Sequence, residues 1–383
     1  MWLLFIVRIS MRIGFIVNPV AGMGGRVGLK GTDGMLKEAL SRGAQPIAPQ
    51  RAVEFLTELK QHLGEFKVEV LLGPGDMGAE EAKTAKFPAQ VLPMKLNAET
   101  SAKDTENAIN QLASTKVDLI VFVGGDGTAR DILNAMKANA SDIPVLGVPS
   151  GVKMYSGIFA VNPYDAATAV LAFIQGRAEV GDAEVMDADE EAIRHDVFDV
   201  KLHGVLKGLS VPSLIQGSKE VSPETVNEKD QQSAIARFVV EQLPPDATLI
   251  LGPGTTVEKI AEVLGVEKTL LGVDIYHKGE VKLDVDEKTL LDSVKDWKTT
   301  WLVLSPIGHQ GILLGRGNQQ ISPEVIRRLQ KKHITIVATM HKLRSIKTGA
   351  LRVDTGDPDV DYMLRGTVMV VVDYQMGVQV QVQ

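Results

Sequence analysis

Short apolar runs alternate with amphipathic segments along the first half of the chain. The apolar runs are rich in β-branched residues, and the segments between them repeat their apolar positions at helical spacing. The expected strands cover residues 12–18, 67–72, 89–94, 117–123 and 144–148. The expected helices cover residues 51–63, 77–86, 101–115 and 128–139. Buried strands that alternate with helices predict βαβ units, and hence a doubly wound parallel sheet.

A second alternating series follows a polar region. A helix over residues 163–175 closes the first series, and the second begins after Pro244 and Pro245. Its expected strands cover residues 248–252, 269–275, 300–305 and 333–339. Its expected helices cover residues 255–264, 286–295 and 323–331, and the last of these begins with Ser322 as N-cap and Pro323 in the first turn. Residues 366–382 predict a closing β-hairpin.

Chain length agrees with two domains, since 383 residues exceed what one hydrophobic core usually organises. We therefore expect an α/β fold: an N-terminal doubly wound domain over residues 11–176 and a second, mixed α/β domain over residues 177–383. Whether the last strands return to the first domain is left open by the pattern.

Charge and cysteine content exclude several classes of function. The 41 basic and 48 acidic residues give a net charge of −7, and the sequence has no long basic run, so a nucleic-acid or anionic-membrane partner is not expected. The absence of cysteine excludes disulfides, thiol nucleophiles and cysteine-bound zinc, and favours a cytoplasmic location.

The first ten residues do not resemble a targeting segment. They are apolar but interrupted by Arg8, lack a signal-peptide cleavage pattern, and are shorter than the roughly 20 residues that span a bilayer. Met11 opens a cleaner strand and is a second candidate for the translation start.

A glycine-rich turn surrounds one carboxylate in the sequence VFVGGDGTARDIL, residues 121–133. Gly124, Gly125 and Gly127 follow a buried strand and precede an amphipathic helix, so they lie where open α/β sheets bind ligands. Glycines there let a phosphate reach backbone N–H groups at a helix N-terminus. Asp126 could be a simple N-cap, but beside a phosphate it could also hold Mg²⁺ or take a proton from an attacking hydroxyl.

The pattern GGDGT resembles the signature shared by NAD kinases, diacylglycerol and sphingosine kinases, and phosphofructokinases. The stretch IVNPVAGMGGR, residues 16–26, is similar to the first strand and glycine turn of the NAD and lipid kinases. The stretch LGPGTTVEKIAEVL, residues 251–264, is similar to a second NAD kinase motif. Residues 11–383 as a whole resemble a divergent branch of predicted ATP-NAD kinases related to the acetoin-catabolism X proteins.

The resemblance implies an ATP- or polyphosphate-dependent kinase that converts NAD⁺ to NADP⁺, with Mg²⁺ accompanying ATP and a possible homo-oligomer. It implies that Asp126 deprotonates the 2′-hydroxyl of NAD⁺; no metal-binding residue is assigned. The residues expected to bind nucleotide are Asn18, Gly24, Gly25, Gly124, Gly125, Gly127, Thr128, Ser150, Gly151, Lys153, Gly254, Thr255, Thr256, Arg316 and Asn318.

Several of these residues also have a plain structural interpretation. Arg316 and Asn318 lie in GRGNQQ, which could contact a phosphate and a base edge or form a polar hairpin turn. Lys153 could neutralise a phosphate or remain solvated. Four aspartates between residues 354 and 361 could hold a cation, although an Asx-rich loop is the commoner outcome.

The chain departs from ordinary NAD kinases in two respects. The adjacent Asn-Glu pair of that family has its sole counterpart in Asn227 and Glu228, within a polar helical stretch, and Glu258 stands where the second motif has tyrosine. Two other functions therefore stay open. One is a kinase of another hydroxyl, on a lipid or small metabolite, and the other is a nucleotide-binding protein without turnover.

Overall fold

The computed structural model divides the chain into two compact units. It describes residues 11–24, 27, 29, 36–96, 100–151, 154–188, 200–211, 226–307, 310–329, 331–346 and 348–383. Unit 1 comprises residues 1–23, 45–189 and 199–218, and unit 2 comprises residues 24–44, 190–198 and 219–383. Gly25, Lys153 and the first ten residues lie outside the described part of the chain.

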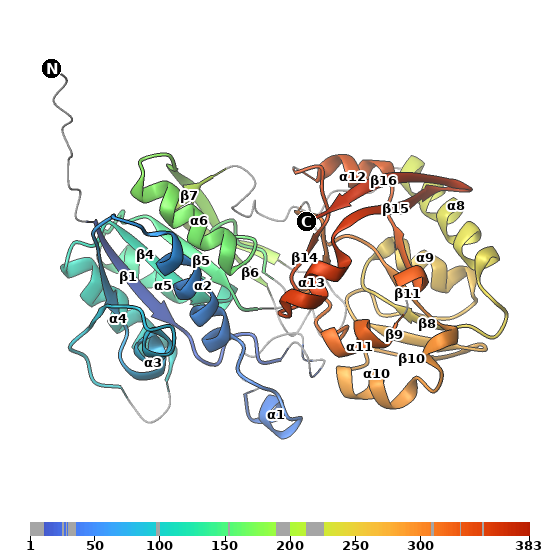
Figure 1. The fold of residues 1–383 in the computed structure, drawn as a ribbon, viewed down its shortest axis with the longest axis horizontal. Coiled ribbons are helices and arrows are strands. Elements are labelled where there is room, and N and C mark those ends of the chain that lie inside the picture. Colours follow the sequence, from blue (N-terminus) through green and yellow to red (C-terminus); the bar gives the residue numbers. More distant parts are fainter. Residues whose placement is uncertain are drawn as a thin grey trace, which may run out of the picture. The chain divides into compact units, whose positions relative to one another are not determined.

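Unit 1 is built on a seven-stranded sheet of order β3-β2-β1-β4-β5-β7-β6 (Figure 1). The strands from β3 to β7 run parallel, and β6 is antiparallel to β7. The strands are β1 (Met11–Val17), β2 (Val68–Leu72), β3 (Gln90–Val91), β4 (Leu119–Gly124), β5 (Val145–Pro149), β6 (Glu179–Ala188) and β7 (Val200–Ser210). Because the chain leaves β1 toward β2 and later returns to its other side at β4, the sheet has a switch point between β1 and β4.

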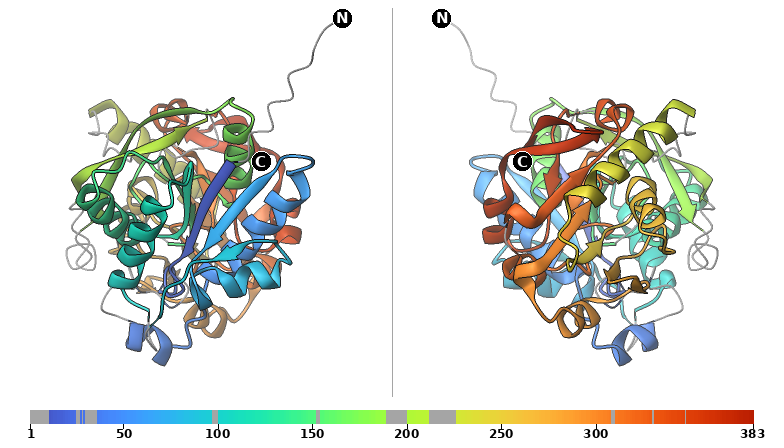
Figure 2. Two further views of the ribbon diagram at one scale, coloured as in Figure 1. Left: turned by 90° about the vertical axis from the view of Figure 1, so that its left-hand side faces the viewer. Right: turned by 90° about the vertical axis from the view of Figure 1, so that its right-hand side faces the viewer.

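Helices cover both faces of this sheet (Figure 2, left). The helices of unit 1 are α2 (Ala48–His62), α3 (Ala79–Thr84), α4 (Ala102–Ser114), α5 (Asp126–Ala138) and α6 (Pro163–Ile174), with a 3₁₀ turn η1 (Gly75–Met77) before α3. Alternate residues of the central strands point to opposite faces. One set packs with α2 and α6, and the other packs with α4 and α5.

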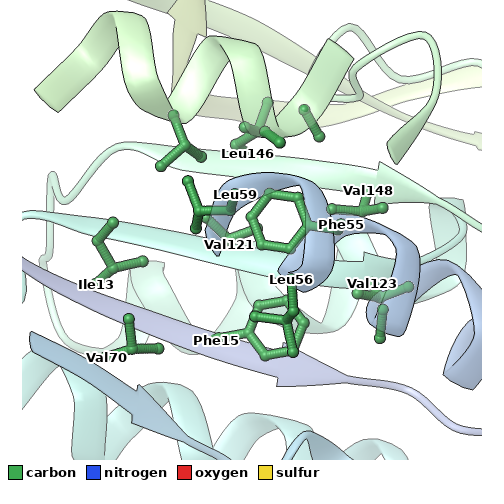
Figure 3. Close-up of a cluster of buried hydrophobic side chains, with 14 of the residues drawn as sticks. Ile13, Phe15, Phe55, Leu56, Leu59, Val70, Val121, Val123, Leu146 and Val148 are labelled. Carbon is green, nitrogen blue, oxygen red and sulfur yellow. The ribbon is translucent and has the colours of Figure 1, made fainter. Parts of the chain in front are cut away.

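The core on the α2 side illustrates why these strands are buried (Figure 3). Phe15 of β1 stacks on Phe55 of α2, with ring centroids 5.5 Å apart, and both side chains are almost fully buried. Val121 and Val123 of β4 project to the same face because they are two residues apart in a strand. This packing holds the carboxyl ends of β1 and β4 side by side.

Unit 2 contains a second seven-stranded sheet, of order β10-β9-β8-β11-β13-β15-β16. Its central strands β8, β11, β13 and β15 are parallel, and β9, β10 and β16 are antiparallel to their neighbours. The strands are β8 (Thr248–Leu251), β9 (Asp274–His277), β10 (Glu280–Lys282), β11 (Thr300–Leu304), β13 (Ile334–Val337), β15 (Gly366–Asp373) and β16 (Met376–Val382). A small separate sheet pairs β12 (Ile312–Leu314) with β14 (Arg352–Val353).

The helices of unit 2 also lie on both faces of their sheet (Figure 2, right). Helices α8 and α9 pack on one face, and α10, α11 and α13 pack on the other. The helices and 3₁₀ turns of unit 2 are α1 (Leu36–Ser41), α8 (Val226–Gln242), α9 (Thr255–Val263), α10 (Glu287–Ser293), η2 (Trp297–Thr299), α11 (Pro323–Arg328), η4 (Lys331–His333), α12 (Met340–Ser345) and α13 (Pro358–Leu364). The predicted N-cap of α11 is confirmed, since Ser322 Oγ accepts from the backbone N–H of Val325 at 3.4 Å.

Two mixed α/β units with largely parallel sheets confirm the predicted fold class. The structure differs from the predicted boundary at residue 176, because β6 and β7 join the first sheet. The closing hairpin forms as predicted, and it pairs with β13 of the second sheet. The strand expected over residues 269–275 begins only at Asp274, since the preceding residues form a loop around the buried carboxylate of that residue.

Within the described ranges, no helix combines the length and apolar character needed to cross a bilayer.

Candidate functional site

Asn18 joins β1 to the glycine turn at the switch point of unit 1. Its backbone N–H donates to the carbonyl of Val123 at 2.9 Å, which continues the pairing of β1 with β4. Its side-chain Nδ2 donates to Thr128 Oγ1 at 2.9 Å. Thr128 is buried, so its hydroxyl serves the contact between β1 and α5. Asn18 and Thr128, both predicted site residues, therefore stabilise the glycine turn through contacts within the protein.

Gly124 can only be glycine in this arrangement. A Cβ at this position would lie 2.5 Å from Oγ1 and 2.6 Å from Cβ of Thr128, closer than side-chain atoms approach one another. Gly125 is the N-cap of α5 in extended conformation, and Asp126 and Gly127 begin the helix. The backbone N–H groups of this first turn lie at the positive end of the helix dipole. The turn is therefore suited to an anion.

Asp126 does not cap α5; its carboxylate binds the loop that follows β5. Oδ2 accepts from the backbone N–H of Tyr155 at 2.6 Å, and Oδ1 accepts from the N–H of Ser156 at 3.0 Å and from its hydroxyl at 2.5 Å. The residue is half-buried, so solvent still reaches it. Hydrogen bonds of this kind and the helix N-terminus both favour the charged carboxylate. The simple N-cap interpretation is therefore wrong, and the carboxylate is held in one orientation.

Tyr155 brings a buried phenol next to this carboxylate. Burial, together with the negative charge of Asp126, raises the pKa of the Tyr155 phenol well above its ordinary value. The phenol is consequently neutral at physiological pH and can act only as a hydrogen-bonding or packing group.

Ser150 presents a buried hydroxyl at the carboxyl end of β5. Its backbone N–H donates to the carbonyl of Gly124 at 3.0 Å, which brings Ser150 and Gly151 against the glycine turn. The Ser150 side chain is 2% exposed, and its Oγ has no hydrogen-bond partner among the described residues. Buried hydroxyls normally have a partner. A ligand oxygen at the turn would supply one.

The glycine turn after β1 abuts the same place. Gly22 has φ +82°, and a Cβ there would overlap the carbonyl oxygen of Ser150. Gly24 follows in the described part of the chain, whereas Gly25 and Lys153 do not fall within it. Unit 1 thus brings together Asn18, Gly124, Asp126, Ser150 and Gly151, which are far apart in the sequence.

The second sheet has a comparable switch point between β8 and β11. Gly254 is the N-cap of α9, with φ +113°, and its N–H donates to the carbonyl of Leu270 at 2.8 Å. Thr255 Oγ1 accepts from Gln232 Nε2 of α8 at 3.2 Å, and Thr256 is buried. The predicted residues Gly254, Thr255 and Thr256 therefore form the start of a helix at the carboxyl edge of a parallel sheet.

Sequence analysis missed two residues beside this turn. Lys342 of α12 donates from Nζ to Ser305 Oγ at 3.0 Å. Lys342 Nζ and Ser305 Cβ would each lie 3.9 Å from a Cβ placed on Gly254. A lysine 88 positions away from the turn has no local sequence signal, because only the sheet brings β8, β11 and β13 together. The ammonium group adds a positive charge to the N-terminus of α9.

Glu228 has a structural contact that the sequence did not reveal. Its Oε1 accepts from Thr339 Oγ1 at 2.7 Å, and its Oε2 lies 3.5 Å from Nδ1 of His341. Glu228 thus ties α8 to the start of α12. The side chain of Asn227 is outside the described residues.

Asn318 has a structural role in its own turn. Its side chain is fully buried, Oδ1 accepts from the N–H of Gly315 at 3.0 Å, and Nδ2 donates to the carbonyl of Leu313 at 2.9 Å. Arg316 is also buried and donates to Gln310 Oε1 at 2.6 Å. The amide of Asn318 therefore closes the turn, and its contact with a nucleotide stays a prediction.

The acidic run near the C-terminus caps a helix. Asp357 is the N-cap of α13, accepts from the N–H groups of Asp359 and Val360, and pairs with Arg327 at 2.5 Å. Asp361 accepts from the N–H and hydroxyl of Thr355. Throughout the described ranges, no group of three or more histidine, aspartate or glutamate side chains could hold a metal ion.

Among the comparisons with known proteins, the match to family models is the one that identifies a family. Nothing among the curated proteins matches the sequence. Among solved structures, UDP-GlcNAc 2-epimerase from Neisseria meningitidis bound to UDP-GlcNAc has 10% sequence identity, covering 92% of this chain and 73% of that chain, with a TM-score of 0.23, which is too low to support an inference. The family of the ATP-NAD kinase N-terminal domain matches residues 13–178, and that of the ATP-NAD kinase C-terminal domain matches residues 245–381. The chain therefore belongs to the ATP-NAD kinase family.

Proposed function

We propose that the protein phosphorylates the 2′-hydroxyl of NAD⁺ to give NADP⁺, with ATP or polyphosphate as the donor. Membership of the ATP-NAD kinase family makes it a phosphotransferase. The observation that carries the substrate proposal is the carboxylate of Asp126, half-buried at the switch point beside a glycine turn suited to phosphate.

Asp126 is the proposed partner of the acceptor hydroxyl. In the reaction, the acceptor oxygen forms a bond to the terminal phosphorus of the donor, the bond from that phosphorus to its bridging oxygen breaks, and the hydroxyl proton passes to Asp126 and then to solvent. Phosphoryl transfer depends mainly on positioning and charge stabilisation, because its transition state is loose. A carboxylate held by Tyr155 and Ser156 meets that need even though its hydrogen bonds reduce its basicity.

The glycine turn is the proposed binding place for a phosphate of one substrate. Gly124, Gly125 and Gly127 leave the N–H groups of α5 accessible to phosphate oxygens. Ser150 Oγ, which is buried and has no partner among the described residues, would donate to a phosphate oxygen there. Without such a partner, a buried hydroxyl destabilises the folded state by about 1–3 kcal/mol.

The start of α9 is the proposed second phosphate-binding place. Gly254, Thr255 and Thr256 form its first turn, and Lys342 adds a charge that pairs with phosphate.

Mg²⁺ is proposed to arrive with the phosphates of ATP. In kinases this ion is usually held by substrate phosphates and one or two carboxylates. When bound, Mg²⁺ would offset the negative charge of the phosphates.

The direct test is turnover by the purified full-length protein. Mg²⁺ and either ATP or polyphosphate are supplied with NAD⁺, NADH, a diacylglycerol and a panel of small alcohols, and products are identified by mass spectrometry. NADP⁺ formation supports the proposal. A different phosphorylated product would favour a kinase of another hydroxyl, and nucleotide binding without product would favour a binding protein. Either of these results contradicts the proposed substrate or activity.

Replacing Asp126→Asn should lower kcat by about 100-fold or more, because the acceptor of the hydroxyl proton is lost. The side-chain amide would also face the N–H of Tyr155, so circular dichroism must show that the variant is folded. The control is Asp142→Asn, an exposed residue in the loop before β5, at the opposite edge of the sheet. A folded Asp126→Asn variant with the turnover of the wild type would exclude this role for Asp126.

A further inference from the structure

The hydroxyl of Ser156 connects Asp126 to the edge of the first sheet. Ser156 belongs to the loop after β5, is fully buried, and contacts strand β6. Its Oγ lies 2.5 Å from Asp126 Oδ1 and 3.3 Å from the carbonyl oxygen of Met186, and it accepts from the N–H of Met186 at 3.0 Å. The much shorter distance to Asp126 assigns the single hydroxyl proton to the carboxylate.

Strand β6 is irregular at the position that reaches Ser156. The register of β6 against β7 shifts between Val185 and Met186, as in a β-bulge. Such irregularities change the direction in which a strand presents its groups and are common beside active sites. The neighbouring N–H of Gly157 donates to the carbonyl of Glu184 at 2.8 Å, which keeps the Ser156 loop alongside β6.

In the two hydrogen bonds that join Met186, Ser156 and Asp126, each group donates to the next. The N–H of Met186 donates to Ser156 Oγ, and the hydroxyl donates to Asp126 Oδ1. A hydroxyl that accepts one hydrogen bond donates a second more strongly, because the two bonds polarise each other. A simple requirement to give the N–H of Met186 an acceptor would not place a carboxylate 2.5 Å from the same hydroxyl.

We infer that Ser156 is a positioning residue for Asp126: its hydroxyl, oriented by Met186, holds the carboxylate in the orientation used in phosphoryl transfer. The inference deepens the proposed function and rests on it for its catalytic part. Strand β6, the edge strand of the sheet, thereby influences the orientation of the Asp126 carboxylate at the switch point. Removing the hydroxyl should alter the rate of chemistry more than the binding of either substrate.

The first experiment measures turnover of Ser156→Ala in the wild-type protein and in the Asp126→Asn variant. The single replacement should lower kcat about 10-fold or more and leave both KM values within about twofold, since the loss falls on the positioning of the reacting group. In the Asp126→Asn background the same replacement should have little further effect, because Ser156 acts through that carboxylate. Equal losses in both backgrounds would overturn the inference.

The second experiment does not depend on turnover. Carboxyl carbons of aspartate are labelled with ¹³C, and the Asp126 signal is identified by its absence from the Asp126→Asn spectrum. Without the Ser156 hydroxyl, the charged carboxylate loses a donor, so Ser156→Ala should move its titration midpoint upward by about one pH unit. The phenol of Tyr155 interacts electrostatically with Asp126, but it stays neutral over this range.

The matched control is Ser322→Ala, which also removes a buried hydroxyl but lies at the N-cap of α11 in unit 2. It should reduce stability without moving either the rate or the Asp126 midpoint. An unchanged midpoint in Ser156→Ala would overturn the positioning role whether or not the protein makes NADP⁺. Absence of NADP⁺ formation with a shifted midpoint would instead contradict the proposed function alone.

Discussion

Asp126 contacts the loop after β5 through the N–H groups of Tyr155 and Ser156 and the Ser156 hydroxyl. Beside it, Gly124 leaves the space that Thr128 fills, and a Cβ on Gly125 would lie 4.0 Å from the Cα of Gly151. The carboxylate therefore bridges two chain segments rather than capping its own helix. At the scale of single residues, the missing side chain of Gly124 decides whether the turn can pack against Thr128.

Glu81 is a second carboxyl group with unusual surroundings. It lies in the first turn of α3, just beyond the carboxyl end of β2, and is 5% exposed. Its Oε2 has no hydrogen-bond partner among the described residues. Burial, reinforced by Asp76 and Glu80, raises the pKa of Glu81 from 4.5 to about 7.

This pKa makes a prediction for stability. Because the folded state binds the proton more tightly than the unfolded state, the contribution of Glu81 is fully present below about pH 4.5 and is lost as pH rises through about 7. At about 1.4 kcal/mol for each pH unit, the loss is about 3 kcal/mol. Glu81→Gln should therefore unfold at higher urea concentration than the wild type at pH 8, and its free energy of unfolding should vary less between pH 5 and 8.

The control for this measurement is Glu80→Gln, an exposed carboxylate one residue away. It should leave the pH dependence of unfolding nearly unchanged. A Glu81→Gln variant less stable than the wild type at pH 8 would mean that the ionised carboxylate has a favourable partner, contrary to this account.

At the scale of elements, both sheets contain the same strand–turn–helix arrangement. In each, a strand ends in a glycine turn, a helix begins directly afterwards, and the next strand in the sheet ends alongside. The N–H groups of the first helical turn have no partners within the helix, so α5 and α9 each offer donors to an anion. Helix α12 adds Lys342 to the second of these places.

We predict that Lys342→Met raises the KM of at least one phosphate-bearing substrate by about 10-fold or more, because charge-assisted hydrogen bonds contribute about 1.5–3 kcal/mol. Steady-state kinetics with both substrates varied would measure this effect. The control is Lys288→Met, which removes the charge of an exposed lysine in α10. Unchanged KM values for both substrates in Lys342→Met would remove Lys342 from the site.

At the scale of the whole molecule, each hydrophobic core cluster belongs to a single unit. Two buried clusters contain only residues of unit 1, and two others contain only residues of unit 2. Each unit therefore has the burial expected of a domain that unfolds as a cooperative body.

Calorimetry should accordingly resolve two unfolding transitions. Phe55→Ala removes a fully buried ring from unit 1, and Leu302→Ala removes a fully buried side chain from unit 2. Core truncations of this kind usually destabilise by about 2–5 kcal/mol, so each variant should lower a different transition temperature. The exposed residues Phe66 and Leu283 provide the control truncations. A single transition lowered equally by both core variants would show that the protein unfolds as one body.

Local patterns anticipated much of this architecture. The alternation of apolar strands and amphipathic helices indicated both α/β units, because side-chain periodicity is a property of short segments. It did not reveal β6 and β7, in which both charged residues such as Lys207 and apolar residues such as Leu202 are exposed. Their membership of the first sheet depends on pairing with β5, a contact between distant segments.

By itself the sequence determined the buried strands, the glycine turns that end β4 and β8, and the carboxylate at position 126, because each follows from residues within one short segment. Only the tertiary structure decided what that carboxylate contacts and that Ser156 lies between it and Met186. It also decided that Lys342 lies near Gly254 and that the side chain of Asn318 hydrogen-bonds within its own turn. These contacts join segments that no local pattern relates, since their proximity arises from strand order and the packing of helices on the sheets.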